Sequence, residues 1–369
     1  MRYKNFFKNL FIFFSKNLFF LLYGKVSKII KPNEDKRIKV NEIIFDEKIK
    51  YSIFTILSGR IYTDTIHDTA IILDNSLVRG PSFQLRDNRN SDCRENVVFK
   101  KGTNRIKKNI KGTVLSLLTG GGGNENYWHW LFDVLPRLEI LNNILQKEKI
   151  DFFLFPNTKK RFQIETLDIL GIEKKKRLSS QVYRHLKSDK IIVTDRPTIC
   201  NKNLKNNEWK EEVPFWIIKY LRKSFLKKEF DQDSNFPKKI YIDRSDSKAH
   251  HSKFRAIKNE IEVKKTLENK GYKSLRIADY NFKDQVKLFS NVEEIAGLHG
   301  GGFANLVFCS PNTKVIEFKN RTTGNIIGDL AQKNNLNYNA IIGETEDSVK
   351  YSQQGIMQVS ISDLKEKLN

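Results

Sequence analysis

The sequence contains few cysteines. Its 369 residues include only Cys93, Cys200 and Cys309, and these spacings match neither a disulfide framework nor a zinc site. We therefore expect reduced, structural thiols in a reducing compartment. No internal repeat or low-complexity segment stands out, and the length leaves room for two domains, each with its own core.

Long uncharged apolar runs are also missing. The first thirty residues are rich in Phe and Leu, but lysines interrupt them, and the longest uncharged stretch covers only residues 17–24. A membrane-spanning helix needs ~20 apolar residues, and no secretory cleavage site is evident. We interpret residues 1–30 as an amphipathic segment on an anionic membrane surface, which predicts a cytoplasmic protein, peripheral on the inner face of the membrane. A helix packed on the protein and a poorly formed single anchor are the alternatives.

Acidic residues are scarce relative to basic ones. The chain has 66 Lys and Arg against 43 Asp and Glu, a net charge of +23, which favours anionic partners such as nucleic acid, phospholipid, acidic glycans or nucleotide sugars. The lysines are spread along the whole chain, and no zinc spacing, RNP motif or aromatic-basic platform is present. We therefore expect no nucleic-acid partner.

Motifs of several familiar nucleotide and metal sites are absent. The glycines within residues 297–302 do not follow the G-x-G-x-x-G spacing of nicotinamide enzymes, and no Walker-type lysine follows them. Residues 231–233 resemble a metal-binding D-x-D clamp, but they lie in a polar stretch just before Pro237 that is typical of a linker. We expect no cofactor, and no metal clamp at residues 231–233.

What the sequence does contain is a strand that runs into a glycine-rich turn. Residues 294–298 predict a short buried strand, Gly300, Gly301 and Gly302 a turn, and residues 303–309 a helix. Glycine leaves the backbone open to a ligand, and the N–H groups at a helix start attract anions such as phosphate. A tight turn that needs glycine only for its dihedrals is the alternative for the triplet alone.

This turn lies within a regular alternation of strands and helices. Strands are predicted at 239–243, 273–277, 294–298, 314–318 and 338–342, and helices at 256–270, 282–290, 303–309 and 325–333. The pattern predicts a parallel sheet with helices on both faces, which binds ligands beyond the carboxyl ends of its strands.

Three polar residues, Arg244, His299 and Glu317, fall at those strand ends. Arg244 suits bidentate hydrogen bonds to a diphosphate, Arg255 can fold back beside it, and Glu317 can accept from both ribose hydroxyls. Together they predict a nucleotide-sugar site. Taken singly, each is also explained as a solvated surface charge.

A second group of polar residues lies on one predicted helix. Asn126, His129, Asp133 and Arg137 share a helix face, while the opposite face is apolar. Asp133 can orient His129, which can take a proton from an acceptor hydroxyl. The alternative is a solvent-facing stripe with an Asp133–Arg137 surface pair. Pro136 is expected to kink this helix.

In their order along the chain, these motifs resemble the landmarks of glycosyltransferase family 61, which includes capsular polysaccharide biosynthesis transferases and eukaryotic relatives that add xylose or N-acetylglucosamine. The likeness spans roughly residues 60–345. It rests on Asn126-Tyr-x-His129-Trp-Leu-Phe-Asp133-x-Leu-Pro136-Arg137, Arg244, Arg255-x-Ile-x-Asn259-Glu260, His299-Gly-Gly-Gly-Phe-Ala-Asn305 and Val-Ile-Glu317-Phe. The common His-Gly-Ala-Gly form has a third glycine here, a permissive change.

The resemblance implies an α/β, GT-B-like fold of two facing Rossmann-like domains with parallel sheets, and inverting transfer without an obligatory metal. It implies that His129 and Asp133 lie at the reacting centre and that Asn126 and Arg137 lie on the acceptor side. The residues implied to bind the donor are Arg244, Arg255, Asn259, Glu260, His299, Gly300, Gly301, Gly302, Asn305 and Glu317.

Four parts are expected: a basic amphipathic segment (1–40), an acceptor-side domain (41–212), a nucleotide-sugar-binding domain (213–345) and a tail (346–369). The predicted function is transfer of a sugar from a nucleotide-sugar donor to a glycan or lipid-linked acceptor in surface polysaccharide biosynthesis. The alternative is a non-catalytic basic protein that binds membranes or glycans.

Overall fold

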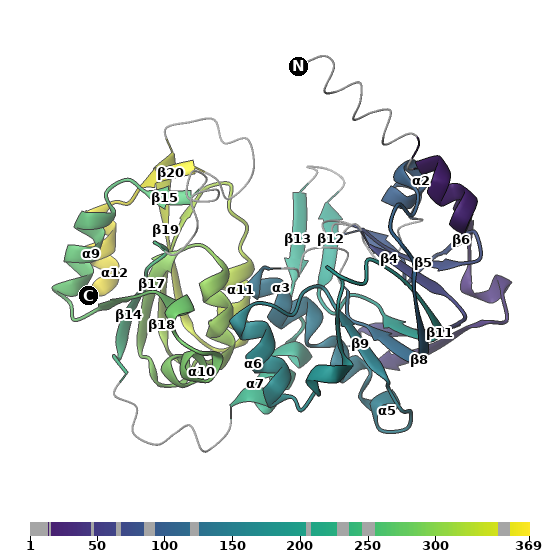
Figure 1. Ribbon diagram of the computed structural model, residues 1–369. Helices are drawn as coiled ribbons and strands as arrows, with labels where there is room; N and C mark the ends of the chain where they lie inside the picture. Colours follow the sequence, from purple (N-terminus) through teal and green to yellow (C-terminus); the bar gives the residue numbers. More distant parts are fainter. Residues whose placement is uncertain are drawn as a thin grey trace, which may run out of the picture. The chain divides into compact units, whose positions relative to one another are not determined.

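The structure is a computed structural model that describes residues 14, 16–45, 48–63, 68–84, 93–118, 125–203, 208–226, 236–245, 255–345 and 355–369. The chain divides into two compact units, Met1–Trp209 and Lys210–Asn369. Figure 1 colours the first from purple to teal and the second from green to yellow. Two of the predicted features, the acidic pair at 231–233 and residues 1–13, lie outside the described residues.

The first unit is built on one mixed sheet. Its strands are β1 (Lys28–Ile30), β2 (Ile38–Ile44), β3 (Lys50–Leu57), β4 (Arg60–Thr63), β5 (Asp68–Leu73), β6 (Ser76–Val78), β7 (Phe83–Gln84), β8 (Lys108–Ser116), β9 (Phe152–Phe155), β10 (Arg177–Ser179) and β11 (His185–Thr194). They follow the order β1-β6-β5-β4-β11-β8-β9-β10, with β3 also pairing β11 and β2. Ile, Val and Leu side chains of the central strands, such as Ile71, Val114 and Ile191, form its core.

The prediction of parallel sheets is right for only part of this unit. Strands β8 to β11 pair in parallel, whereas β2, β3, β4 and β5 pair with antiparallel neighbours. Short turns explain the difference, because parallel strands need a long crossover and antiparallel strands do not. Asp74 and Asn75 alone connect the antiparallel strands β5 and β6, and Asp74 adopts the positive φ of 51° that such turns require.

The parallel part of the sheet has a topological switch point. The strands β8, β9, β10 and β11 follow one another in the chain, but their order in the sheet is β11-β8-β9-β10. After β8 the chain thus continues to β9 on one side of β8, whereas β11 is added on the other side. The crossover from β8 to β9 contains α3 (Tyr127–His129), the π-helix η2 (Trp130–Val134), α4 (Arg137–Ile140) and α5 (Asn142–Leu145), and α6 (Arg161–Ile169) precedes β10. Ligands of such sheets bind at the carboxyl ends of the strands that flank this point.

The second unit is a seven-stranded, mostly parallel sheet. Its strands are β14 (Lys239–Ile242), β15 (Arg255–Ile257), β16 (Lys273–Leu275), β17 (Glu294–Leu298), β18 (Lys314–Asn320), β19 (Asn337–Thr345) and β20 (Gly355–Gln358). The spatial order is β15-β20-β19-β18-β17-β14-β16. The strands β14, β16, β17, β18 and β19 pair in parallel, which confirms the predicted parallel sheet here. Their order places a switch point between β14 and β17.

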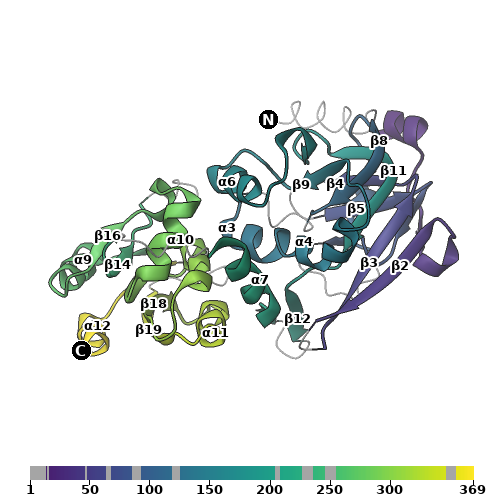
Figure 2. The ribbon, with the colours of Figure 1, turned by 90° about the horizontal axis from the view of Figure 1, so that it is seen from below.

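Helices cover both faces of this sheet. They are α7 (Phe215–Phe225), α9 (Glu260–Glu268), α10 (Phe282–Asn291), the 3-10 helix η6 (Gly301–Phe308), α11 (Ile326–Lys333) and α12 (Ile361–Leu368). On one face α12 packs against α9, and on the other η6 contacts α7, α10 and α11. Figures 1 and 2 show α9 and α12 together at the left, with α10 and α11 on the other side of the strands. The rings of Phe225, Phe282 and Phe308 meet edge to face beneath that second layer.

Two predicted elements differ in the structure. The helix expected over 256–270 is α9 alone, and its first predicted residues form β15, which pairs with β20 of the tail. Helical periodicity did not reveal this because the partner strand lies a hundred residues later. The tail itself supplies Met357, Val359 and Leu364 to the core of the second unit. The helix expected over 303–309 is the 3-10 helix η6.

The two described cysteine side chains lie in the interior of the protein. Cys93 and Cys309 are both buried, which agrees with the prediction of structural thiols for these two. Burial raises the pKa of the Cys309 thiol well above its usual range. At the other end of the chain, residues 16–23 are helical. Within the described ranges, no helix combines the length and apolar character needed to cross a membrane.

Candidate functional site

The helix that carries His129 begins at Asn126. The Oδ1 atom of Asn126 accepts from the backbone N–H of Trp128 at 2.9 Å, as an N-cap does. The helix then widens to the π-helix, in which Leu135 N–H donates to the carbonyl of Trp130 at 3.1 Å. Pro136 has no N–H for the carbonyl of Phe132, and a turn at 135–136 separates η2 from α4. The structure thus places a break between two helices at Pro136, where the sequence predicts a kink.

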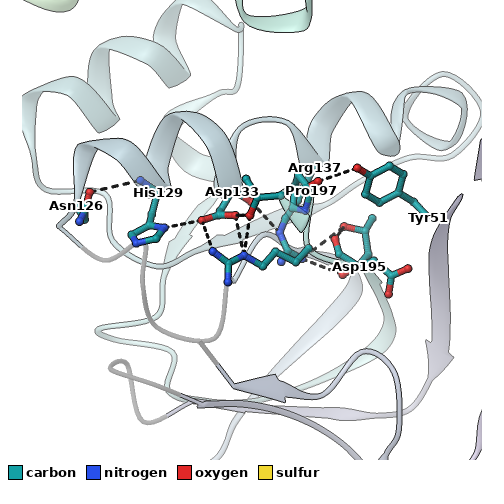
Figure 3. Close-up of polar contacts among 10 residues, drawn as sticks. Tyr51, Asn126, His129, Asp133, Arg137, Asp195 and Pro197 are labelled. Carbon is teal, nitrogen blue, oxygen red and sulfur yellow. Dashed lines mark hydrogen bonds and ion pairs between the residues drawn. The ribbon is translucent and has the colours of Figure 1, made fainter. Parts of the chain in front are cut away.

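Asp133, within the π-helix, is the centre of a buried polar network (Figure 3). Its Oδ2 lies 2.6 Å from Nδ1 of His129. Arg196 donates to both carboxylate oxygens, from Nε to Oδ1 at 2.9 Å and from Nη2 to Oδ2 at 3.1 Å. The hydroxyl of Thr198 also donates to Oδ1. Asp133 is fully buried, and the side chains of this network supply the hydrogen bonds that its buried oxygens require.

These contacts fix the charge of Asp133. Burial by itself would raise the pKa of the carboxyl, but the charge of Arg196 and the hydrogen bonds from His129 and Arg196 hold the pKa well below its usual range. An ionised carboxylate can only accept hydrogen bonds, so the ring nitrogen Nδ1 of His129, which lies against it, carries a proton. When the ring is neutral, Nε2 therefore bears the lone pair and can accept a proton.

Arg137 is also buried and holds the helix to β11. Its Nε donates to the backbone carbonyl of Asp133 at 3.0 Å and its Nη1 to the carbonyl of Thr194 at 2.9 Å. Burial lowers the pKa of Arg137 to about 10, against the opposing effect of Asp133. The alternative of a solvent-facing stripe with an Asp133–Arg137 surface pair is wrong, since neither residue is exposed. Contacts of Asn126 and Arg137 with an acceptor stay predictions.

The network lies at the switch point of the first sheet. The helix with Asp133 follows β8, and Arg196 and Thr198 follow the end of β11. Arg196 and Thr198 were missed by the sequence reasoning, because they lie more than sixty residues from Asp133. The available signal was an arginine placed directly after a buried strand, the same signal that singled out Arg244.

In the second unit, the glycine turn follows β17 at the corresponding place. His299 extends the sheet by donating its N–H to the carbonyl of Phe318 at 2.9 Å, and η6 begins at Gly301. A Cβ added at Gly300 would lie 2.7 Å from Nη1 of Arg244, whereas one added at Gly301 would meet nothing within 4 Å. Gly300 thus permits the close approach of a guanidinium, and Gly301 faces open space.

Arg244 and Arg255 converge on this turn. Both guanidinium groups donate to the backbone carbonyl of His299, Arg255 at 3.4 Å. Among the described residues, no carboxylate pairs with Arg255, and burial together with repulsion by Arg244 lowers the pKa of Arg255 to about 10. Two neighbouring guanidinium groups whose positive charges repel each other form a site that a polyanion would stabilise.

Glu317 lies beneath the turn, at the level of His299. It is fully buried, with Oε1 bonded to Nδ1 of His299 and Oε2 accepting from the hydroxyl of Tyr338. Burial and the negative charge of Glu317 both raise the pKa of Tyr338 well above its usual range. Lys319 lies 4.0 Å from Oε2. Glu317 thus orients His299, and its predicted direct contact with ribose hydroxyls stays a prediction.

The remaining predicted donor residues have partners within the fold. Asn305 donates to Gln285 at 3.1 Å, which ties η6 to α10. Asn259 exchanges two hydrogen bonds with the backbone of Val359, at 2.9 and 3.0 Å. Glu260 accepts from Tyr241 at 2.9 Å. The structure therefore groups Arg244, Arg255, His299 and the glycines, while Asn259 and Glu260 bond to the tail and to β14.

One comparison with known proteins gives a match. The sequence model of the family described as Glycosyltransferase 61 matches residues 127–316. That span contains His129, Asp133, the arginine pair and the glycine turn, and covers more than half of the chain. No curated protein matches the chain.

Proposed function

The chain belongs to glycosyltransferase family 61, and on this premise we propose that it transfers a sugar from a nucleotide-sugar donor to a glycan or lipid-linked acceptor in surface polysaccharide biosynthesis. The family implies the transfer reaction and its two substrate classes. The inverting course, the independence from metal and the pathway are parts of the proposal.

We propose a GT-B architecture in which the second unit holds the donor. Support comes from each unit taken by itself. In both, polar side chains follow the two strands that flank a switch point: the helix with Asp133 follows β8 and Arg196 follows β11, while Arg244 follows β14 and His299 follows β17. This is where open α/β sheets bind their ligands.

The donor diphosphate is proposed to bind at the glycine turn. Arg244 and Arg255 would supply positive charge, and the N–H groups of residues 300–302 would donate to phosphate oxygens. As the bond between the anomeric carbon and the phosphate oxygen breaks, negative charge grows on the leaving diphosphate, so these donors stabilise the transition state more than the ground state. The Glu317–His299 pair would hold the turn in shape for this contact.

His129 is proposed as the general base. A hydroxyl of the acceptor attacks the anomeric carbon, its proton passes to Nε2 of His129, and the nucleoside diphosphate leaves with the electron pair of the broken bond. Asp133, kept ionised by Arg196, stabilises the imidazolium that forms. The observation that carries this assignment is the 2.6 Å contact between Nδ1 of His129 and the fully buried Asp133.

The test begins with a screen of nucleotide sugars for slow hydrolysis and for transfer. With the active donor, His129→Ala should lower kcat by roughly 10²–10⁴-fold with little change in donor KM, because it removes a group that acts in the transition state. Arg244→Ala should raise donor KM as well as lower kcat. Full turnover of His129→Ala on the true acceptor would refute the base assignment. Failure to bind any nucleoside diphosphate would favour the non-catalytic binding protein.

A further inference from the structure

Residues 16–23 form a helix that is docked on the first unit. The Nζ of Lys16 donates to the carbonyl of Lys100 at 2.7 Å, and the ring of Phe20 lies against Gly102, where an added Cβ would be 2.5 Å from it. Tyr23 accepts from the backbone N–H of Lys107 at 3.2 Å and packs edge-on to His185. Figure 1 shows this purple helix beside α2 (Val97–Lys101). The described part of the predicted amphipathic segment thus packs on the protein.

The opposite face of the same helix is apolar and exposed. Leu18, Leu21 and Leu22 retain 53%, 85% and 56% of their accessible surface. Their i, i+3, i+4 spacing places them on one face, away from Phe20 and Tyr23. Ile106, next to the docking residue Lys107, is 74% exposed. Exposed leucines grouped on a single helix face indicate a binding surface.

Basic side chains accompany this face. Exposed lysines and arginines occur directly after the helix and along the segment on which it docks: Lys25, Lys28, Lys100, Lys101, Arg105 and Lys108. In the same segments the acidic Glu95 pairs with Lys100 at 2.8 Å. Exposed leucines thus occur together with exposed basic residues in the adjoining segments. This combination matches an anionic lipid bilayer, with acyl chains for the leucines and phosphates for the lysines.

We propose that the apolar face of residues 16–23 binds an anionic membrane surface and lies in its plane. Because the other face is fixed to Lys100, Gly102 and Lys107, the helix would hold the first unit in one orientation on the bilayer, unlike a flexible tether. This surface uses none of the residues assigned to sugar transfer, so the two proposals stand or fall separately.

The test is co-sedimentation of the full chain with vesicles of phosphatidylcholine alone or with phosphatidylglycerol added. We expect binding to the anionic vesicles only, weakened by salt. The double variant Leu21→Ser/Leu22→Ser should lose binding by at least about tenfold. Ile261→Ser is the matched control, since Ile261 is also an exposed helical residue, at 87%, and it should bind as the wild type. Thermal unfolding checks that all three proteins fold alike.

Two results would overturn the proposal. One is wild-type binding by the double variant, or equal binding of the wild type to neutral and anionic vesicles. The other is a wild-type dimer that the double variant abolishes while neither protein binds vesicles, which would assign the face to a second copy of the chain.

Discussion

At the residue scale, two histidines have the same kind of partner. His129 contacts the fully buried Asp133 through Nδ1, and His299 contacts the fully buried Glu317 through Nδ1. The two carboxylates differ in their other partners. Both oxygens of Asp133 accept from the guanidinium of Arg196, whereas Glu317 accepts from the hydroxyl of Tyr338. A carboxylate held ionised by Arg196 suits a base that must become a cation, and we assign catalysis to His129 on that ground.

Arg196→Met should destabilise the first unit. The change removes the charge that compensates buried Asp133, and breaking a buried pair from one side typically costs about 3–5 kcal/mol in the free energy of unfolding. Urea unfolding at neutral pH measures it. Arg161→Met is the control, since Arg161 pairs with Glu165 on an exposed helix face and should change stability by less than about 1 kcal/mol. Equal stability of the Arg196 and Arg161 variants would contradict the role of Arg196.

The same variant should change how stability depends on pH. The folded-state pKa of Asp133 lies below its unfolded value of ~3.9, so its contribution is complete above that pH and is lost as pH falls towards the folded value. In Arg196→Met the folded pKa rises towards or past the unfolded one. As pH falls from about 5 to about 3, the free energy of unfolding should therefore decrease more in the wild type than in the variant. Parallel curves would contradict this.

Tyr338→Phe should weaken donor binding more than catalysis. It removes one hydrogen bond from Glu317, worth about 1.5–3 kcal/mol for a charged acceptor, and loosens the group that orients His299 beside the glycine turn. We expect a raised donor KM together with a smaller fall in kcat. Tyr272→Phe is a matched control, because Tyr272 donates to Glu294 at 2.6 Å at the start of β17. A raised KM in both variants would indicate a general effect on the sheet.

At the element scale, the glycine turn is fitted to the arginine that follows β14. Gly300→Ala places a methyl group 2.7 Å from the present position of the Arg244 guanidinium, which must then move. Because a flexible side-chain end can yield, stability should fall by less than about 1 kcal/mol, while the Kd for a nucleoside diphosphate should rise at least about tenfold. Calorimetric titration measures the Kd. Gly324→Ala is the control: a Cβ added there would meet nothing within 4 Å, and the Kd should stay unchanged. An unchanged Kd in Gly300→Ala would contradict donor binding at the turn.

The tail is the second element with a testable role. Asn259 bonds twice to the backbone of Val359, so Asn259→Ala should destabilise the second unit by about 1–3 kcal/mol. Donor KM should stay near the wild-type value if these bonds are its whole role. A large rise in KM without loss of stability would instead establish the donor contact that the family resemblance implies.

At the scale of the whole molecule, the sequence predicted what local patterns control. Strand and helix alternation gave the parallel sheet of the second unit, and Arg244 and the glycines were found because they follow strands directly. Pairings between distant segments were not predictable: Arg196 meets Asp133 across more than sixty residues, and residues 255–257 become a strand only because β20 lies beside them. The mixed sheet of the first unit was not predicted, because the sequence indicated strands there but not which strands pair with one another.

The central claim is that the second unit binds the donor diphosphate through Arg244 while the first supplies the base. Calorimetric titration of the full chain with a nucleoside diphosphate, for the wild type, Arg244→Ala and His129→Ala, tests it most directly. We predict binding by the wild type, a Kd raised at least about tenfold in Arg244→Ala, and an unchanged Kd in His129→Ala. Equal binding by Arg244→Ala and the wild type would contradict the account.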